Sequence, residues 1–378
     1  MNIAMIATEK LPVPPIRGGA TQIYLQAAAE RIARSDEITI FSIADPQLAK
    51  QETSRGVHHI RIDADQYPEQ LETELKKSHY DVVHLCNRPA WLSRLKAASP
   101  ESRFVLSVHN DMFSEHKIDR EAGKQAIDAA SRIVTVSDFI RDGIVRRFPE
   151  AGTKTETVYS GVDPDAFYPP WTDTGADVRR IMRRKAGCEA KKVILFVGRL
   201  SKVKGPHILL QALPTIIARH PEAMLVFIGS KWFGDNAVNN YVRHLFTLAA
   251  TQREHVTFIQ FVKPVDMPYY YAMADLFVCS SQWQEPLARV HYEAMAAGLP
   301  IVTTNRGGNK EAVDAEKNGV IIERFDEPSA YAKVIGDLLD DENRRQAMGR
   351  HGRKKAEERY SWERVAGDLL RVYRSVST

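Results

Sequence analysis

Two glutamates in the segment QEPLARVHYEAMAAGLP, residues 284–300, are separated by seven residues. Carboxylates accept hydrogen bonds, so such a pair could hold the hydroxyl groups of sugar rings. Glu285 follows a short apolar run, and Pro286 suits the first turn of a helix that stops at Gly-Leu-Pro. Glu293 is expected about two turns into this helix. The alternative is an ordinary helix with one glutamate at its start and one solvated glutamate. Spacing alone favours that alternative.

A second group of charged residues follows the apolar run VILFVG. Arg199, Lys204 and Gly205 precede a helix that we expect to begin near Pro206. Backbone N–H groups at a helix N-terminus attract anions, and a guanidinium beside an ammonium group suits a diphosphate. From spacing alone, a diphosphate site and an ordinary charged loop are about equally supported. The segment matches neither G-x-x-x-x-G-K-[ST] nor G-x-G-x-x-G, so an ATPase or a common dinucleotide site loses its main support.

The elements that must position these residues alternate between short apolar runs and helix-like stretches, which predicts parallel sheets built from βαβ units. We expect strands within NIAMIA, EITIFS, VHHIRID, DVVHLC, RFVLSV and RIVTVS, and then within KVILFVG, AMLVFIG, HVTFIQ, LFVCS, PIVTTN and GVIIE. TQIYLQAAAERIA and GPHILLQALPTIIARH are predicted helices. Each half opens with a strand, a Gly-containing loop and a helix. The predicted fold class is therefore α/β, with two facing Rossmann-like, doubly wound parallel-sheet domains.

A chain of 378 residues is too long for one comfortable core. The segment YSGVDPDAFYPPWTDTG is rich in Pro, Gly and Asp and is predicted to connect the domains. We expect an N-terminal domain over 1–168, completed by a C-terminal helix at about 360–378, and a C-terminal domain over 169–359. Such folds bind ligands at the carboxyl ends of their strands, so the interdomain cleft is the predicted site.

The composition is that of an ordinary globular protein, with 44% hydrophobic and 26% charged residues and a net charge of +4. This charge gives little support for nucleic acid as a partner. Cys86, Cys188 and Cys279 lie far apart without a C-x-x-C motif, which indicates neither a disulfide framework nor a zinc site. The sequence shows neither a signal peptide nor an apolar run long enough to span a membrane. We expect a cytoplasmic setting, with peripheral membrane contact left open.

Taken together, these motifs resemble glycosyltransferase family 4, whose members are retaining nucleotide-sugar enzymes of GT-B architecture. The resemblance rests on GRLSKVKG, QEPLARVHYEAMAAGLP and NRGGNKEAV. It covers nearly the whole chain through PIRGGA, SVHND, VSDFIR, SGVDPDAF and YSWERVA. The segment from Glu285 onward looks most like a spore-coat-associated branch found in spore-forming bacteria. The family implies a nucleoside-diphosphate sugar donor, with uridine as the default nucleotide, and a hydroxyl acceptor.

The resemblance also implies roles for the charged residues of the second domain. Arg199 and Lys204 would neutralise the diphosphate, including charge that develops on the leaving group. Glu285 would bind hydroxyls of the transferred sugar, and Glu293 would accept from the ribose hydroxyls. The two carboxylates would therefore contact the two sugar rings of one ligand.

In the first domain, the resemblance implies that the Gly18–Gly19 loop approaches the donor's phosphate and sugar. His109 would face the donor sugar and shape the charge at its reacting carbon, without acting as a general base. The implied catalytic residues are thus His109, Arg199, Lys204 and Glu285. Further candidates near the site are Ser137, Arg141, Gly229, Phe261 and Val262. For Ser137 and Arg141, the start of a surface helix is an almost equal alternative.

The sequence departs from the family pattern after Glu-Pro, where family members usually have Phe-Gly. This chain has Leu287 and Ala288. Alanine adds a methyl group and narrows the allowed backbone conformations. We expect the backbone amides of Leu287, Ala288 and Arg289 to contact the donor, with donor choice or activity altered by the departure.

Two Asp-x-Asp sequences, at 63–65 and 163–165, look like the metal-binding motif of the other glycosyltransferase architecture. A turn role suits both better. We expect no essential metal and no cofactor, because Arg199 and Lys204 would supply the positive charge. The basic stretch RRQAMGRHGRKKAEERY is predicted to be a solvated helix face, with membrane-surface attraction as the alternative.

The leading hypothesis is an enzyme that transfers a hexose-type sugar to a hydroxyl acceptor. The second is a structural or sugar-binding coat protein with weak or no turnover, for which Leu287 and Ala288 are the only support. A phosphorylase or epimerase on the same architecture is a weaker third. The acceptor, the sugar, the nucleotide and the oligomeric state are left open by the sequence.

Overall fold

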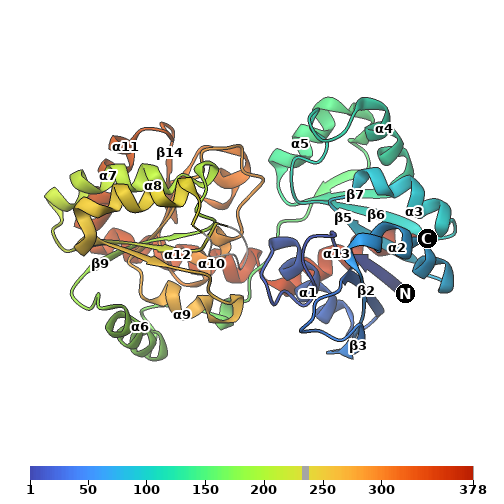
Figure 1. The fold of residues 1–378 in the computed structure, drawn as a ribbon, viewed down its shortest axis with the longest axis horizontal. Helices are drawn as coiled ribbons and strands as arrows, with labels where there is room; N and C mark the ends of the chain where they lie inside the picture. Colours follow the sequence, from blue (N-terminus) through green and yellow to red (C-terminus); the bar gives the residue numbers. More distant parts are fainter. Residues whose placement is uncertain (232–237, 378) are drawn as a thin grey trace. The chain divides into compact units, whose positions relative to one another are not determined.

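The computed structural model describes residues 1–231 and 238–377. Packing divides the chain into two compact units (Figure 1). The first unit comprises Met1–Gly161 and Trp362–Thr378, and the second comprises Val162–Ser361.

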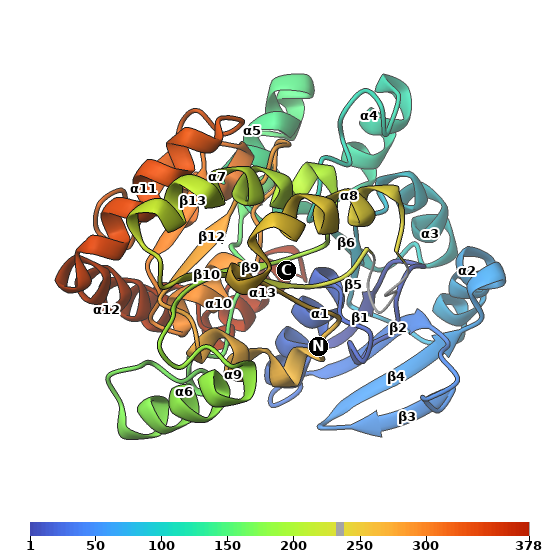
Figure 2. The same cartoon turned by 60° about the vertical axis from the view of Figure 1, so that its left-hand side comes forward.

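The described residues of the first unit form an eight-stranded sheet in the order β3-β4-β2-β1-β5-β6-β7-β8. Its strands are β1 (Asn2–Ile6), β2 (Glu37–Ile43), β3 (Gln51–Ser54), β4 (Val57–Ile62), β5 (Val82–Cys86), β6 (Arg103–Val108), β7 (Arg132–Thr135) and β8 (Thr155–Thr157). The strands pair in parallel, except that β3 pairs antiparallel with β4 at the sheet edge (Figure 2). The predicted strands of this half are confirmed. The sequence gives no sign of β3 and β8, because QETS and TET are short and lack an apolar run.

The helices of the first unit cover both faces of this sheet. They are α1 (Ala20–Ile32), α2 (Tyr67–Lys77), α3 (Leu92–Ala98), α4 (Arg120–Ala129), α5 (Asp138–Arg147) and α13 (Trp362–Ser377). Helices α2 to α5 pack on one face through residues such as Leu71 and Leu95. On the other face α1 and α13 lie side by side, although they come from opposite ends of the chain (Figure 1). Leu25 and Leu369 belong to their shared core.

The described residues of the second unit form a six-stranded parallel sheet in the order β11-β10-β9-β12-β13-β14. Its strands are β9 (Lys192–Val197), β10 (Ala223–Ile228), β11 (Val256–Ile259), β12 (Leu276–Cys279), β13 (Ile301–Thr304) and β14 (Gly319–Ile322). All were predicted. The chain runs outward from β9 to β11 and then returns to start again at β12 beside β9. The strand order therefore reverses between β9 and β12, which is where doubly wound sheets bind ligands.

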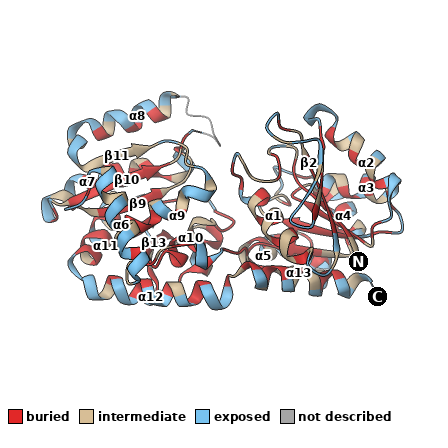
Figure 3. Ribbon diagram, turned by 90° about the horizontal axis from the view of Figure 1, so that it is seen from below, coloured by how far each residue is buried: buried red, intermediate tan, exposed pale blue. Residues whose placement is uncertain are grey.

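The helices of the second unit are α6 (Asp173–Ala186), α7 (Pro206–Arg219), α8 (Asn240–Ala249), α9 (Met267–Ala272), α10 (Val290–Ala296), α11 (Pro328–Asp340) and α12 (Glu342–Arg359). Helices α7, α8 and α11 lie on one side of the sheet, and α9 and α10 lie on the other (Figures 1 and 2). Burial is concentrated in the strands, whereas the outer faces of the helices are exposed (Figure 3).

Short 3-10 helices occur in both units. They are η1 (Ala64–Gln66), η2 (Pro89–Trp91), η3 (Pro149–Ala151), η4 (Pro164–Ala166), η5 (Lys202–Lys204), η6 (Ala250–His255), η7 (Pro264–Asp266) and η8 (Gly307–Ala312).

The prediction that the basic stretch is a solvated helix face is wrong for two of its residues. Helix α12 packs against α10, and Arg345 and Lys355 are buried. The Lys355 Nζ donates to the Ala312 carbonyl at 3.1 Å and pairs with the Asp314 carboxylate at 2.9 Å. The long aliphatic stems lie in the packed interface while the charged ends find oxygen acceptors.

Candidate active site

The reversal of strand order brings the two sequence motifs of the second unit together. The turn at 198–205 follows β9, and the loop at 280–289 follows β12. The Ser280 Oγ donates to the carbonyls of Lys204 at 3.1 Å and Gly205 at 3.0 Å. Gly205 has a φ of +71°, and a Cβ there would lie 2.1 Å from the Ser280 carbonyl oxygen. Only glycine allows the turn to approach the loop this closely.

This packing places Lys204 directly on Glu285. The Lys204 Nζ lies 2.6 Å from the Glu285 Oε2, which also accepts from the Ser281 Oγ at 2.9 Å and the Trp283 Nε1 at 2.7 Å. The Lys204 Nζ also lies 5.8 Å from the centre of the Trp283 ring, within range of a cation–π contact. In the described part of the chain, no donor contacts the Glu285 Oε1. That oxygen therefore keeps its capacity to accept a hydrogen bond.

The contacts of Glu285 keep it ionised although it is buried. Burial raises the pKa of the Glu285 carboxyl, but the Lys204 ammonium and the hydrogen bonds from Trp283 and Ser281 hold it below its usual range. Burial lowers the pKa of the Arg199 guanidinium, and the nearby Glu285 carboxylate opposes that effect. The site thus contains two cations around one buried carboxylate.

A glycine pair in the segment NRGGNKE supports the Glu285 backbone. The Gly308 N–H donates to the Glu285 carbonyl at 2.8 Å, and the Gly307 N–H donates to the Gln284 Oε1 at 2.7 Å. Gly307 has a φ of +60°, and a Cβ there would lie 2.1 Å from the Glu285 carbonyl oxygen. The loop after β13 is therefore in direct backbone contact with the loop that carries Glu285.

This contact predicts a difference between two glycine substitutions. Gly187 at the end of α6 has a φ of +64°, but a Cβ there would meet nothing within 4 Å. Gly187→Ala should cost about 1 kcal/mol from backbone strain alone. Gly307→Ala should cost about 1–3 kcal/mol more, because its Cβ also overlaps the Glu285 backbone. Urea unfolding of both variants measures the difference, and equal losses would contradict the close approach.

The segment between Glu285 and α10 differs from its prediction. Pro286 was expected in the first helical turn, but α10 begins at Val290, so Pro286 lies in the loop and Glu293 lies in the first turn rather than two turns in. The Ala288 N–H donates to the Asn309 Oδ1 at 3.2 Å. The structure thus places this amide on a protein acceptor rather than leaving it open for a donor molecule.

Glu293 is mostly buried and held by two side chains. The Tyr271 hydroxyl donates to its Oε2 at 2.9 Å, and the Arg289 Nη2 lies 3.4 Å from its Oε1. Burial, together with the Glu293 carboxylate, raises the pKa of the Tyr271 hydroxyl well above its usual range. Tyr271 therefore remains a hydrogen-bond donor that orients Glu293.

In the first unit, the candidates Gly18, Gly19 and His109 all adjoin helix α1. Gly18 and Gly19 have φ values of +82° and +100°, and they directly precede the first residue of α1. His109 follows β6, and its backbone N–H donates to the Asn87 Oδ1 at 2.7 Å. The His109 ring packs edge-on against Tyr24 of α1, with 4.7 Å between ring centres.

The remaining candidates have structural contacts of their own. The Ser137 Oγ caps α5 by accepting from the Ile140 N–H at 3.3 Å, and Arg141 pairs with Asp138 at 2.6 Å. These contacts are those of residues at the start of a surface helix, which was the alternative interpretation of Ser137 and Arg141. A Cβ on Gly229, which follows β10, would lie 2.1 Å from the Gly198 carbonyl oxygen. Phe261 and Val262 follow β11 and are half-buried.

Several residues of this site carried no functional prediction. They are Tyr271, Ser281, Trp283, His291 and Asn309. Ser281 and Trp283 precede Glu285 closely, so a hydroxyl and an indole N–H next to a candidate carboxylate were the available signal. No comparable signal marks Tyr271 and Asn309, which reach the site from α9 and η8.

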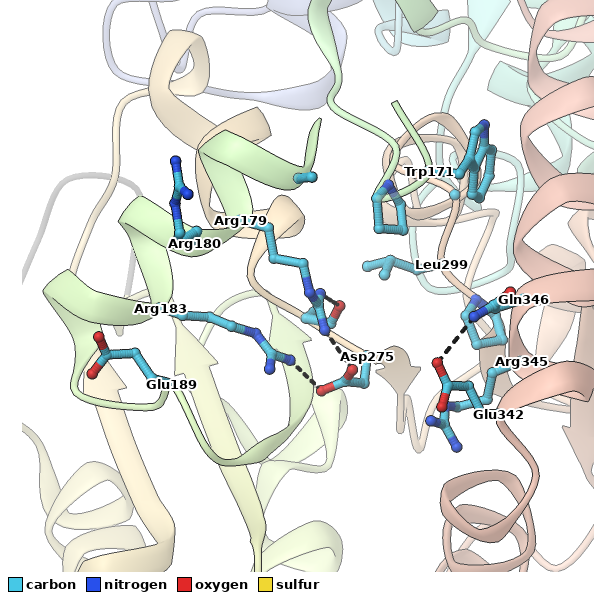
Figure 4. Close-up of a pocket in the computed structure, with 15 residues that line it drawn as sticks. Trp171, Arg179, Arg180, Arg183, Glu189, Asp275, Leu299, Glu342, Arg345 and Gln346 are labelled. Carbon is cyan, nitrogen blue, oxygen red and sulfur yellow. Dashed lines mark hydrogen bonds and ion pairs between the residues drawn. The ribbon is translucent and has the colours of Figure 1, made fainter. Parts of the chain in front are cut away.

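A pocket of about 460 Å³ lies where the strands of the second sheet begin, opposite the strand ends that carry the candidate site. It borders the residues that directly precede β12 and β13, and it is lined by Trp171, Arg179, Arg183 and Arg345, among others (Figure 4). Asp275 lies between Arg179 and Arg183 and is 2.5 Å from each guanidinium. These arginines are therefore already paired, and the pocket edge is a structural junction between α6 and the sheet.

The Asp-x-Asp sequences have the predicted turn roles. The Asp163 carboxylate accepts from the Asp165 N–H at 3.2 Å, and the Asp63 carbonyl accepts from the Gln66 N–H at 3.1 Å. Across 1–231 and 238–377, no group of three His, Cys, Asp or Glu side chains is arranged to hold a metal ion. That the reaction needs no metal stays a prediction. Among the helices the structure describes, none is both long and apolar enough to cross a membrane.

Comparison with known proteins gives consistent matches along the chain. The family described as Glycosyltransferase Family 4 matches residues 17–166, and Glycosyl transferases group 1 matches residues 178–355. Spore coat protein SA of Bacillus subtilis is 59% identical over 99% of both chains. The D-inositol 3-phosphate glycosyltransferase of Corynebacterium urealyticum is 29% identical over 100% of this chain and 96% of that protein. Anabaena HepE in complex with UDP-glucose shares the fold, with a TM-score of 0.81 and 20% identity over 99% of this chain and 100% of that one.

Proposed function

Because the chain belongs to glycosyltransferase family 4 and is related to the spore-coat branch, we propose that it is a retaining enzyme that moves a hexose-type sugar from a UDP-sugar to a hydroxyl acceptor. The observation that carries this proposal is the contact between Lys204 and Glu285 beside the point where the strand order reverses. It combines a cation with an ionised carboxylate that keeps one oxygen available. UDP and UDP-glucose are bound by HepE, which supports a uridine donor.

In the proposed reaction, the bond between the sugar's anomeric carbon and the diphosphate breaks, and a bond to the acceptor oxygen forms on the same face. The acceptor proton passes to the departing phosphate oxygen. Arg199 and Lys204 stabilise the negative charge on that phosphate, an effect worth about 3–4 kcal/mol for one well-placed donor. Glu285 binds hydroxyls of the transferred sugar through Oε1.

The other roles are proposed on the same basis. Glu293 holds the ribose hydroxyls, while Gly18, Gly19 and His109 bind the transferred sugar and the phosphates. We also propose a contribution to spore coat or cell-surface polysaccharide formation, supported by the identity to spore coat protein SA. A coat protein with weak turnover is the second candidate. The hydrogen bond from the Ala288 N–H to Asn309 favours this candidate, because that amide is then not available to a donor molecule.

A nucleotide panel tests the donor assignment. Purified protein is heated with UDP, GDP, ADP or TDP, and the unfolding temperature is recorded. UDP at about 100 times its dissociation constant should stabilise the protein by about 2.7 kcal/mol. In Glu293→Ala the UDP shift should disappear, because the ribose loses its acceptor.

Glu189→Ala is the matched control for this panel. Glu189 is an exposed glutamate at the other edge of the unit, where it pairs with the exposed Arg184. This variant should keep the full UDP shift. If none of the four nucleotides stabilises the wild type, the enzyme proposal fails. If UDP binds but UDP-sugars are never turned over, the coat-protein candidate is favoured.

A further inference from the structure

A buried histidine connects the Glu285 loop to the sheet. His291 lies in α10 and is fully buried. Its Nδ1 lies 2.8 Å from the Ala288 carbonyl oxygen, which also accepts from the His291 backbone N–H at 3.2 Å. Its Nε2 lies 2.8 Å from the Thr303 Oγ1 in β13. Because a carbonyl oxygen only accepts, the Nδ1 must carry the proton. The imidazole thus joins the loop backbone to the adjacent strand.

Asn309 holds the other polar group of the same residue. Its Oδ1 accepts from the Ala288 N–H at 3.2 Å, and its Nδ2 lies 3.6 Å from the Cys279 Sγ. Asn309 is fully buried as well. The N–H and the C=O of Ala288 are therefore both bound by buried side chains, one from η8 and one from α10.

These contacts limit how the loop can move. Ala288 is three residues after Glu285 and two before α10, so it links the carboxylate to the helix. Leu287 beside it is buried, which fixes the same segment from its apolar side. An apolar side chain at 291 would fill space equally well, whereas a buried imidazole requires partners for both nitrogens. Here the partners are the Ala288 carbonyl and the Thr303 hydroxyl. Because α10 carries the imidazole, the bond to Ala288 fixes the loop relative to this helix.

We propose that His291 and Asn309 are positioning residues that hold the Ala288 peptide groups and thereby fix Glu285 in the place needed to bind the transferred sugar. This inference rests on the proposed function. Glu293 is held separately by Tyr271 and Arg289. Loosening the Ala288 contacts should therefore impair sugar transfer while leaving nucleotide binding intact.

Two amide substitutions at 291 separate the two hydrogen bonds. The asparagine amide nitrogen occupies roughly the place of Nδ1, so His291→Asn keeps a donor for the Ala288 carbonyl. The glutamine amide occupies roughly the place of Nε2, so His291→Gln keeps a partner for Thr303. It loses the side-chain bond to the Ala288 carbonyl, which then keeps only the backbone N–H of residue 291. We expect His291→Asn to retain kcat within about 3-fold. His291→Gln should lose on the order of 10- to 100-fold in kcat with UDP-sugar, as expected for a displaced binding group. Both variants should bind UDP as the wild type does.

Thr303→Val controls for the sheet-facing hydrogen bond and should leave kcat near the wild-type value. Equal kcat in His291→Asn and His291→Gln would overturn the inference. A parallel loss of UDP affinity in His291→Gln would also overturn it, since that indicates general disruption.

Hydrogen exchange of 285–291 provides a readout independent of activity. Exchange should accelerate in His291→Gln and not in His291→Asn, and this comparison holds even if the wild type binds no nucleotide and the proposed function itself fails.

Discussion

Replacing Lys204 with methionine is expected to lower the free energy of unfolding by about 3 kcal/mol at pH 7 and to reduce turnover by on the order of 100- to 1,000-fold. The first effect arises because the variant leaves the Glu285 carboxylate buried with no cation on its Oε2. The second arises because the proposed diphosphate site loses its ammonium group. Urea unfolding and a donor-turnover assay measure the two effects separately.

The stability loss should depend on pH in a defined direction. In the wild type the pKa of Glu285 is held below its usual range, so its ionised form stabilises the protein above the unfolded pKa, and this contribution is lost as pH falls through the folded pKa. Without Lys204, burial should raise the folded pKa above the unfolded value of about 4.3. The variant then gains stability relative to the wild type as pH falls from 7 towards 4, and its deficit narrows.

The double variant Lys204→Met with Glu285→Gln is the control for this interpretation. It removes the buried charge together with its partner, so most of the lost stability at pH 7 should return. Turnover should not return, because both proposed ligand contacts are absent. A single variant as stable as the wild type at pH 7, or a double variant no more stable than the single one, would show that the ion pair does not hold these loops together.

The direct contact between Lys204 and Glu285 explains what sequence reasoning could and could not reach. The two residues were assigned to different parts of a ligand, one to phosphate and one to sugar. Their mutual contact spans 81 positions of the chain. It follows from the adjacency of β9 and β12, which strand patterns alone do not specify. The ammonium group that is proposed to bind phosphate pairs directly with the Glu285 carboxylate.

The strands other than β3 and β8 were predictable because each contains an apolar run long enough to be buried, such as KVILFV in β9. Helix boundaries were less predictable. Pro286 suits a first helical turn, but the hydrogen bonds of the Glu285 and Ala288 backbone to the loop after β13 delay the start of α10 to Val290. Tertiary contacts therefore override local preference at the place where the candidate ligand groups lie. The buried basic residues of α12 were missed for a related reason. Lys355 donates to the Ala312 carbonyl, 43 positions earlier, and Arg345 donates to the Leu338 carbonyl at the end of α11.

A second large effect is expected at the opposite edge of the same sheet, from Asp275→Asn. Asp275 directly precedes β12, and its carboxylate accepts from Arg179 and Arg183 (Figure 4). It also accepts from the Val193 N–H. The pKa of the Arg179 guanidinium is lowered by burial and by the neighbouring Arg183, although Asp275 opposes both effects. A buried cation of this kind is costly to leave without its partner. We expect the free energy of unfolding to fall by about 3–5 kcal/mol.

Asp177→Asn provides the matched control, because Asp177 pairs with Arg180 on the exposed side of the same helix, where the two side chains are 64% and 68% exposed. That exposed pair should contribute less than about 0.5 kcal/mol. In Asp275→Asn, Arg179 and Arg183 keep the carbonyls of Ala272, Ala274, Met273 and Lys191 as acceptors, but these dipoles do not neutralise two charges. UDP binding well below the unfolding temperature should persist, since the substitution lies at the far edge of the sheet from Glu285. If the two aspartate variants lose equal stability in urea, the buried pairing does not hold α6 to the sheet, and the carbonyl contacts alone are sufficient.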